Sequence, residues 1–198
     1  MPIKNYLTID VEDYFHVSAF EKISPPTTWK GRETRVKRNT DLVLKILDEA
    51  SVKATFFVLG WVADQYPSIV PQIANEGHEI ASHGYLHQRV ALQDRKTYRE
   101  DIRRSKKLLE DQTGQKIVGY RAPSYSITRK TDWAFDELLE AGYQYDSSIF
   151  PMQHDFYGIP EWPRFSGYAV KSDDGWQARS TPVTDKPSIK ELPITTLN

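Results

Sequence analysis

The chain has 198 residues and a net charge of -1, a length that predicts one domain spanning residues 1–198. Its 26 basic and 27 acidic residues are balanced, which argues against a nucleic-acid partner bound through a basic face. The absence of cysteine excludes disulfides, thiolate metal sites and cysteine nucleophiles, so any metal must be held by nitrogen and oxygen ligands. No export signal and no apolar run of the about 20 residues that span a membrane are visible, so we expect a cytoplasmic protein without a membrane span.

Short β-prone runs alternate with helical patterns up to Ser147. Strands are expected where β-branched and aromatic residues concentrate, at residues 6–9, 53–59, 78–82 and 117–120. Helices are expected where apolar residues recur at helical spacing. One begins after a cap at Asn39 or Thr40, and the others span residues 61–75, 98–110 and 131–141. Residues 18–37 predict a long loop, and a loop-rich tail follows Ser147 until a last strand near residues 191–194. This alternation predicts parallel strands with helical crossovers, in an open doubly wound sheet or a barrel.

Ionisable residues gather where the predicted strands end. Four strand ends carry them: Asp10, Glu12 and Asp13; His83 and His87; Arg121; and Asp146. Any one of these groups also suits an ordinary solvated loop. Because ligands of parallel α/β folds bind at the carboxyl ends of the strands, we expect the four groups to surround one site.

The two histidines of the third strand end have the spacing of metal ligands. His83 and His87 are four residues apart, so on a helical turn both imidazoles point the same way. Alone, the pair is as often two loop histidines, but the acidic cluster at a neighbouring strand end favours a metal. One carboxylate there can ligate the ion while another takes a proton from its water. A ligand set of histidine and carboxylate, without thiolate, suits Zn²⁺ best, and Co²⁺, Ni²⁺ or Mn²⁺ are alternatives.

Arg121 and the loop after it supply two further groups. The guanidinium of Arg121 can hold a carboxylate through two hydrogen bonds, although a surface arginine is the plainer interpretation. Pro123 stiffens a loop that can point the Ser124 amide at an oxyanion.

These motifs, in this order, resemble the polysaccharide deacetylases of carbohydrate esterase family 4, the NodB-homology domain. The resemblance runs from about Tyr6 to Asn198 and rests on LTIDVEDYF at residues 7–15, KATFFVLG at residues 53–60 and GHEIASH at residues 77–83. The first of these segments is similar to the exopolysaccharide branch that accompanies exosortase systems. The resemblance implies a distorted (β/α) barrel that hydrolyses N-acetyl, alternatively O-acetyl, groups on an acetylated glycan. It thus implies a hydrolase of linear amides in exopolysaccharide biosynthesis.

The resemblance also implies roles by position. Asp10 matches the catalytic base, Arg121 the arginine that orients this base, and His83 and His87 the metal ligands. The substrate and oxyanion contacts that it implies are Ser124, Tyr125, Asp146 and Phe150. Two positions depart from the family pattern. Val11 stands where common members have a second aspartate, so the carboxylate ligand is Glu12 or Asp13. Gly84 replaces the usual Ser or Thr, which we expect to cost only a local hydrogen bond.

The family's last motif, which holds a general-acid histidine, is expected beyond Asn198. We therefore expect a truncated domain whose barrel is incomplete at the C-terminus. Its last strand, near Ile194, should leave an open edge through which a homo-oligomer can form. Two other functions fit the same fold: a non-catalytic glycan-binding module, and a metal-independent amidohydrolase similar to allantoinase-like relatives.

Overall fold

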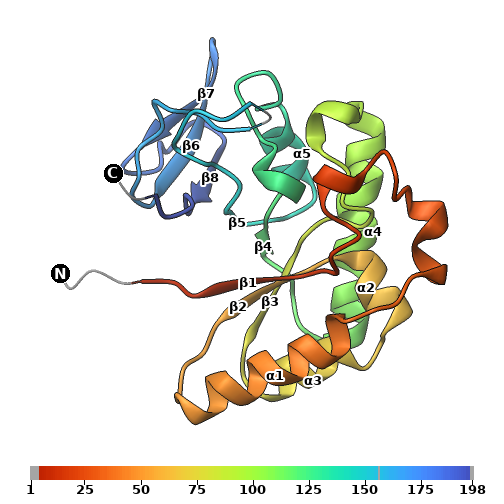
Figure 1. The fold of residues 1–198 in the computed structure, drawn as a ribbon. Coiled ribbons are helices and arrows are strands. Elements are labelled where there is room, and N and C mark those ends of the chain that lie inside the picture. Colours follow the sequence, from red (N-terminus) through yellow and green to blue (C-terminus); the bar gives the residue numbers. More distant parts are fainter. Residues whose placement is uncertain (1–4, 156, 197–198) are drawn as a thin grey trace.

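The computed structural model describes residues 5–155 and 157–196. Its centre is an eight-stranded sheet with the strand order β1-β2-β3-β4-β5-β8-β6-β7 (Figure 1). The strands are β1 (Thr8–Val11), β2 (Thr55–Val58), β3 (Glu79–Ser82), β4 (Gly119–Tyr120), β5 (Tyr145–Asp146), β6 (Gly167–Ser172), β7 (Gly175–Arg179) and β8 (Ser188–Glu191). Strands β1 to β5 and β8 run parallel, and β6 is antiparallel to both β7 and β8.

Helices form a layer outside the parallel strands (Figure 1). They are α1 (Val36–Glu49), α2 (Gly60–Gln65), α3 (Ile69–Asn75), α4 (Arg95–Thr113) and α5 (Ala134–Glu140). Helix α4 packs against α2, α3 and α5, and α3 also contacts α1. Within the described residues, no helix is both long enough and apolar enough to cross a membrane.

The central strands are buried on both faces. In β2, Phe56, Phe57 and Val58 are almost fully inaccessible to solvent. In the sequence, a parallel strand that is covered on both faces is a continuous run of apolar residues, without alternation of apolar and polar residues. The run at residues 53–59 therefore predicted its strand correctly.

The sheet is strongly curved. Arg121 follows β4, which is three strands away from β1, or about 14 Å in a flat sheet with the usual strand spacing. Yet Arg121 Nη2 donates to Thr8 Oγ1 of β1 at 3.0 Å, a reach that a flat sheet does not allow. The carboxyl end of β4 therefore faces β1 across the interior, as in a barrel.

Two predicted helices differ from the observed ones. Helix α1 begins at Val36, before Asn39 and Thr40, because the Asp13 carboxylate accepts hydrogen bonds from the Arg35 and Val36 amides. The helix predicted at residues 61–75 is two helices, α2 and α3, with a break around Pro67. Proline lacks the amide hydrogen and restricts the residue before it, so the first helix ends there.

The expected open edge at the last strand is wrong. Strand β8 pairs with β5 on one side and with β6 on the other. The tail contains the hairpin of β6 and β7, which folds back to cover β8 (Figure 1). Within the described residues, the strands with one neighbour each are β1 and β7.

Candidate metal centre and active site

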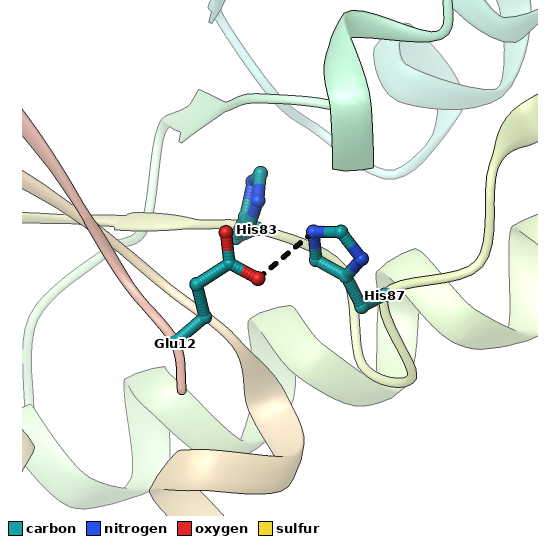
Figure 2. Close-up of side chains that lie close together, drawn as sticks. All are labelled: Glu12, His83 and His87. Carbon is teal, nitrogen blue, oxygen red and sulfur yellow. Dashed lines mark ion pairs between the residues drawn. The ribbon is translucent and has the colours of Figure 1, made fainter. Parts of the chain in front are cut away.

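Three side chains from two strand ends converge on one point. Glu12 follows β1, and His83 and His87 lie in the loop after β3 (Figure 2). One ligand atom from each of the three lies within 4.8 Å of the others. Glu12 Oε2 is 3.0 Å from His87 Nε2, and the two imidazole rings have centroids 5.2 Å apart.

The spacing and chemistry of this cluster fit a divalent metal. Nitrogen and oxygen ligands at 2.0–2.1 Å from a tetrahedral ion lie about 3.3 Å from each other. Glu12 Oε2 is buried, and its contact with His87 Nε2 at 3.0 Å brings together two atoms that can both ligate a cation. His83 Nδ1 lies 2.9 Å from the carbonyl oxygen of Arg121, so Nδ1 carries the proton and Nε2 is free to ligate.

The electrostatics keep His83 and Glu12 in their ligating forms. Burial lowers the pKa of His83, and the nearby Asp10 and Glu12 carboxylates oppose this only in part. Burial raises the pKa of Glu12, but the hydrogen bond and charge of His87, together with His83, outweigh it, so the net pKa lies below the usual value. A neutral imidazole and an ionised carboxylate are the forms that bind metal.

Asp13 lies outside this cluster. Its Oδ2 accepts the amide hydrogens of Arg35 at 2.6 Å and Val36 at 3.0 Å, and its Oδ1 accepts that of Tyr14. These bonds satisfy the exposed amides at the start of α1, as an N-terminal capping group does. Of the two carboxylates between which the sequence could not choose, the structure brings only Glu12 to the histidines.

Asp10 and Arg121 form an ion pair beside the cluster. Arg121 Nη1 donates to Asp10 Oδ1 at 2.7 Å. The guanidinium is almost fully buried and is also held by Thr8, by Ser147 Oγ at 2.9 Å and by the Ser147 carbonyl at 3.1 Å. The Asp10 side chain remains 22% exposed. Arg121 therefore fixes one carboxylate oxygen of Asp10, while Asp10 stays open to solvent.

Ser124, Tyr125 and Phe150 lie on the Arg121 side of the site. Ser124 and Tyr125 have φ values of 53° and 52°, a left-handed conformation that is uncommon outside glycine. Ser124 Oγ is 2.6 Å from Ser18 Oγ, and the Tyr125 amide donates to the Ala122 carbonyl. The Tyr125 ring stacks on Phe150 with centroids 6.1 Å apart. Backbone strain of this kind is common at functional sites.

Asp146 is fully buried beneath the site rather than exposed in it. It accepts hydrogen bonds from the amide and hydroxyl of Ser148. Its neighbour is Glu191 of β8, also fully buried, whose Oε2 has no partner among the described residues. Burial raises the pKa of both carboxyls, and their mutual repulsion raises that of Glu191 further. One proton shared between them gives the unpartnered oxygen a hydrogen bond.

Sequence reasoning missed several supporting residues. Thr8 and Ser147 hold Arg121, and Glu191 lies against Asp146. Ser147 and Glu191 lie at the carboxyl ends of β5 and β8, which is the signal that found the others, whereas Thr8 begins β1. Their partners, however, come from strands distant in sequence, and no local pattern predicts such pairs.

The remaining histidines near predicted loops do not line the metal cluster. His16 is buried among Phe15, Trp29 and Trp61, and its Nδ1 accepts the Asp13 amide at 2.8 Å. His154 is exposed and stacks on Tyr157 with ring centroids 3.8 Å apart.

Comparisons with known proteins identify the family of this chain. Residues 26–145 match the family model described as polysaccharide deacetylase. A peptidoglycan deacetylase-like protein of Gibberella zeae is 29% identical over 77% of this chain and 43% of its own length. A peptidoglycan deacetylase of Helicobacter pylori is 27% identical over 76% of this chain and 46% of its own length. The chain thus spans less than half the length of these curated relatives.

A solved structure has a similar fold. The crystal structure of a candidate polysaccharide deacetylase from Mycobacterium smegmatis superposes with a TM-score of 0.68 and 28% identity, over 96% of this chain and 58% of that one. This similarity confirms the distorted (β/α) barrel of the NodB type. Since the family model also covers more than half of the residues, this chain belongs to the polysaccharide deacetylase family.

Proposed function

We propose that this chain is a metal-dependent hydrolase that removes N-acetyl groups from a polysaccharide. One observation carries the proposal: Glu12, His83 and His87 converge beside the ion pair of Asp10 and Arg121. A metal-binding trio next to a carboxylate that is open to solvent is the arrangement that hydrolysis of an amide by an activated water requires. The names of the Gibberella and Helicobacter relatives point to the same reaction class for those proteins.

Each residue has a separate task in this proposal. Glu12, His83 and His87 hold one divalent ion, for which Zn²⁺ suits the donor set and Co²⁺, Ni²⁺ or Mn²⁺ are alternatives. When bound, the ion supplies Lewis acidity and lowers the pKa of a water molecule. Asp10 accepts the proton of the attacking water, and Arg121 orients its carboxylate through the hydrogen bond to Oδ1.

The substrate contacts come from the loops after β4 and β5. The amide of Ser124 donates to the oxyanion, and Tyr125 and Phe150 offer ring faces beside the acetyl group. Asp146 supports this side from below by holding the Ser148 backbone. We propose an exopolysaccharide as the substrate, because residues 7–15 are similar to the exopolysaccharide branch of the family.

The test is acetate release from an N-acetylglucosamine oligomer and from an O-acetylated polysaccharide. The chain is assayed after chelation and again after one equivalent of Zn²⁺ is restored. We expect release from the N-acetylated oligomer that depends on metal and is lost in His87→Ala. Faster release from the O-acetylated substrate makes the protein an esterase. Metal binding without release from either substrate favours a glycan-binding module, and release without metal favours the metal-independent amidohydrolase.

A further inference from the structure

A carboxylate outside the proposed catalytic set holds the loop between the two histidines. Asp101 lies on α4 and is half-buried. Its Oδ2 accepts the Tyr85 amide hydrogen at 2.7 Å, and its Oδ1 accepts that of Leu86 at 3.1 Å. Both oxygens are therefore bonded to consecutive amides of the three residues that separate His83 from His87.

The backbone of this loop needs such support. Gly84 has a φ of +71°, and His87, which is not glycine, has a φ of 52°. The loop carbonyls of Gly84 and Tyr85 accept hydrogen bonds from the Gly60 and Trp61 amides at the start of α2. The loop is thus clamped from two sides, by α2 through its carbonyls and by Asp101 through its amides.

The same contact accounts for glycine at position 84. A Cβ built there lies 2.9 Å from Asp101 Oδ2, closer than real Cβ atoms come to another heavy atom. A serine or threonine at this position would shift the Asp101 carboxylate and would also strain the backbone, whose φ there is +71°. In this chain, the glycine that departs from the family pattern at position 84 therefore leaves room for the Asp101 carboxylate.

The two histidine rings differ in how they are held. His83 Nδ1 is hydrogen-bonded to the Arg121 carbonyl, whereas His87 Nδ1 is buried and has no hydrogen-bond partner among the described residues. Apart from the contact of Nε2 with Glu12 Oε2, the direction of the His87 ring therefore depends on its backbone. On the side of His83, the nearest anchor of that backbone is the bond from the Leu86 amide to Asp101.

We propose that Asp101 is a positioning residue that fixes the loop so that His87 meets His83 and Glu12 around one metal ion. The inference rests on the proposed metal site. Without the carboxylate, the loop can relax and His87 can turn away, which leaves two ligands. Loss of a residue that orients a metal ligand commonly lowers metal affinity by about 10–100-fold.

The experiment measures the affinity for Zn²⁺ by competition with a chromogenic chelator, for the wild-type chain and Asp101→Asn. Asparagine keeps one acceptor oxygen and places an NH₂ group against the second amide. We expect a loss of about 10–100-fold in affinity per folded molecule. Asp101→Glu, which can restore both bonds from a longer side chain, should recover part of it.

Asp94→Ala is the matched control. Asp94 caps the same helix, accepting the Thr97 amide at 2.7 Å, and no hydrogen bond of Asp94 within the described residues reaches the histidine loop. Its removal should destabilise α4 by about 1 kcal/mol and leave the Zn²⁺ affinity of the folded protein unchanged. A merely structural role of Asp101 predicts the same behaviour for Asp101→Asn.

Two results separate this inference from the metal site itself. If the wild-type chain binds Zn²⁺ and folded Asp101→Asn binds it equally well, Asp101 has no positioning role and the metal site stands. If the wild-type chain binds no stoichiometric Zn²⁺, both proposals are overturned. Should Asp101→Asn not fold, Gly84→Ala displaces the same carboxylate from the other side, and an unchanged affinity in that variant also contradicts the inference.

Discussion

Two adjacent carboxylates have different partners in this chain. Glu12 faces the histidines, whereas Asp13 caps α1. Glu12→Gln should therefore weaken Zn²⁺ binding strongly and change stability little in the metal-free protein. Asp13→Asn should leave Zn²⁺ affinity nearly unchanged, and Asp13→Ala should lower the free energy of unfolding by about 0.5–2 kcal/mol. Chelator competition and urea unfolding check the pair, and loss of metal in Asp13→Asn would reverse the assignment.

His16 predicts a pH dependence of stability. Burial lowers the pKa of His16 to about 4, and the Glu12 carboxylate offsets this only in part. In the unfolded chain the value is about 6.5, so between these two values the unfolded state binds more protons. Stability should fall as the pH falls from 6.5 to 4, by up to about 1.4 kcal/mol per pH unit from this group.

The measurement is urea unfolding of metal-free protein across this range. In His16→Asn the side-chain oxygen can replace Nδ1 as acceptor for the Asp13 amide, and the titrating group is gone, so the pH slope should become shallower. His154→Asn, at an exposed histidine, is the control. An identical slope in wild type and His16→Asn would show that His16 is not buried in its neutral form.

At the scale of the elements, β5 and β8 are joined by the buried carboxyls of Asp146 and Glu191. The folded state holds a proton there that the unfolded chain releases above about pH 4.5, so this pair lowers stability as the pH rises. Glu191→Gln supplies a permanent donor to Asp146 and should flatten the stability profile above about pH 4.5 in urea unfolding. Glu49→Gln, at an exposed glutamate of α1, should leave the profile as in wild type.

Elements that depend on local pattern could be predicted from the sequence, and those that depend on distant partners could not. The apolar run of β2 and the strand ends at His83 and Arg121 were correctly placed. The start of α1 was missed because its capping carboxylate, Asp13, is 22 residues away from Arg35. The hairpin of β6 and β7 was missed although Asp174-Gly175, where Gly175 has a φ of +100°, is a usual turn signal between two strands.

The candidate site shows the same division. The strand-end rule found all three residues that converge at the candidate metal centre, because the carboxyl ends of parallel strands lie at one edge of a sheet. It could not choose between Glu12 and Asp13 as the ligand, because the choice depends on which carboxylate accepts the amide hydrogens at the start of α1. It also gave no sign of Asp101, whose partners are backbone amides 15 and 16 residues away.

At the scale of the whole molecule, the proposed metal ties the end of β1 to the loop after β3. A ligand that binds only the folded state stabilises it by about 2.7 kcal/mol at a concentration 100 times its dissociation constant. For a chain of this size, Zn²⁺ should therefore raise the melting temperature by about 5–10 °C. His87→Ala should show little of this shift in the same thermal scan, and an equal shift would place the metal elsewhere.

The one-domain organisation and the homo-oligomer stay predictions. The buried apolar residues form one connected core that includes Val11 of β1 and Ile189 of β8, which favours one domain. Any association through a free sheet edge involves β1 or β7, because β8 is paired on both sides.

The most direct test of the account is the rate of acetate release by Zn²⁺-loaded Asp10→Asn on the N-acetylglucosamine oligomer. Asp10 contacts Arg121 and is not part of the metal trio, so the variant should bind Zn²⁺ like the wild type. Its turnover should be lower by about 10²-fold or more, the usual contribution of a general base. Wild-type turnover in the metal-loaded variant would contradict the proposed division between the base Asp10 and the ligands Glu12, His83 and His87.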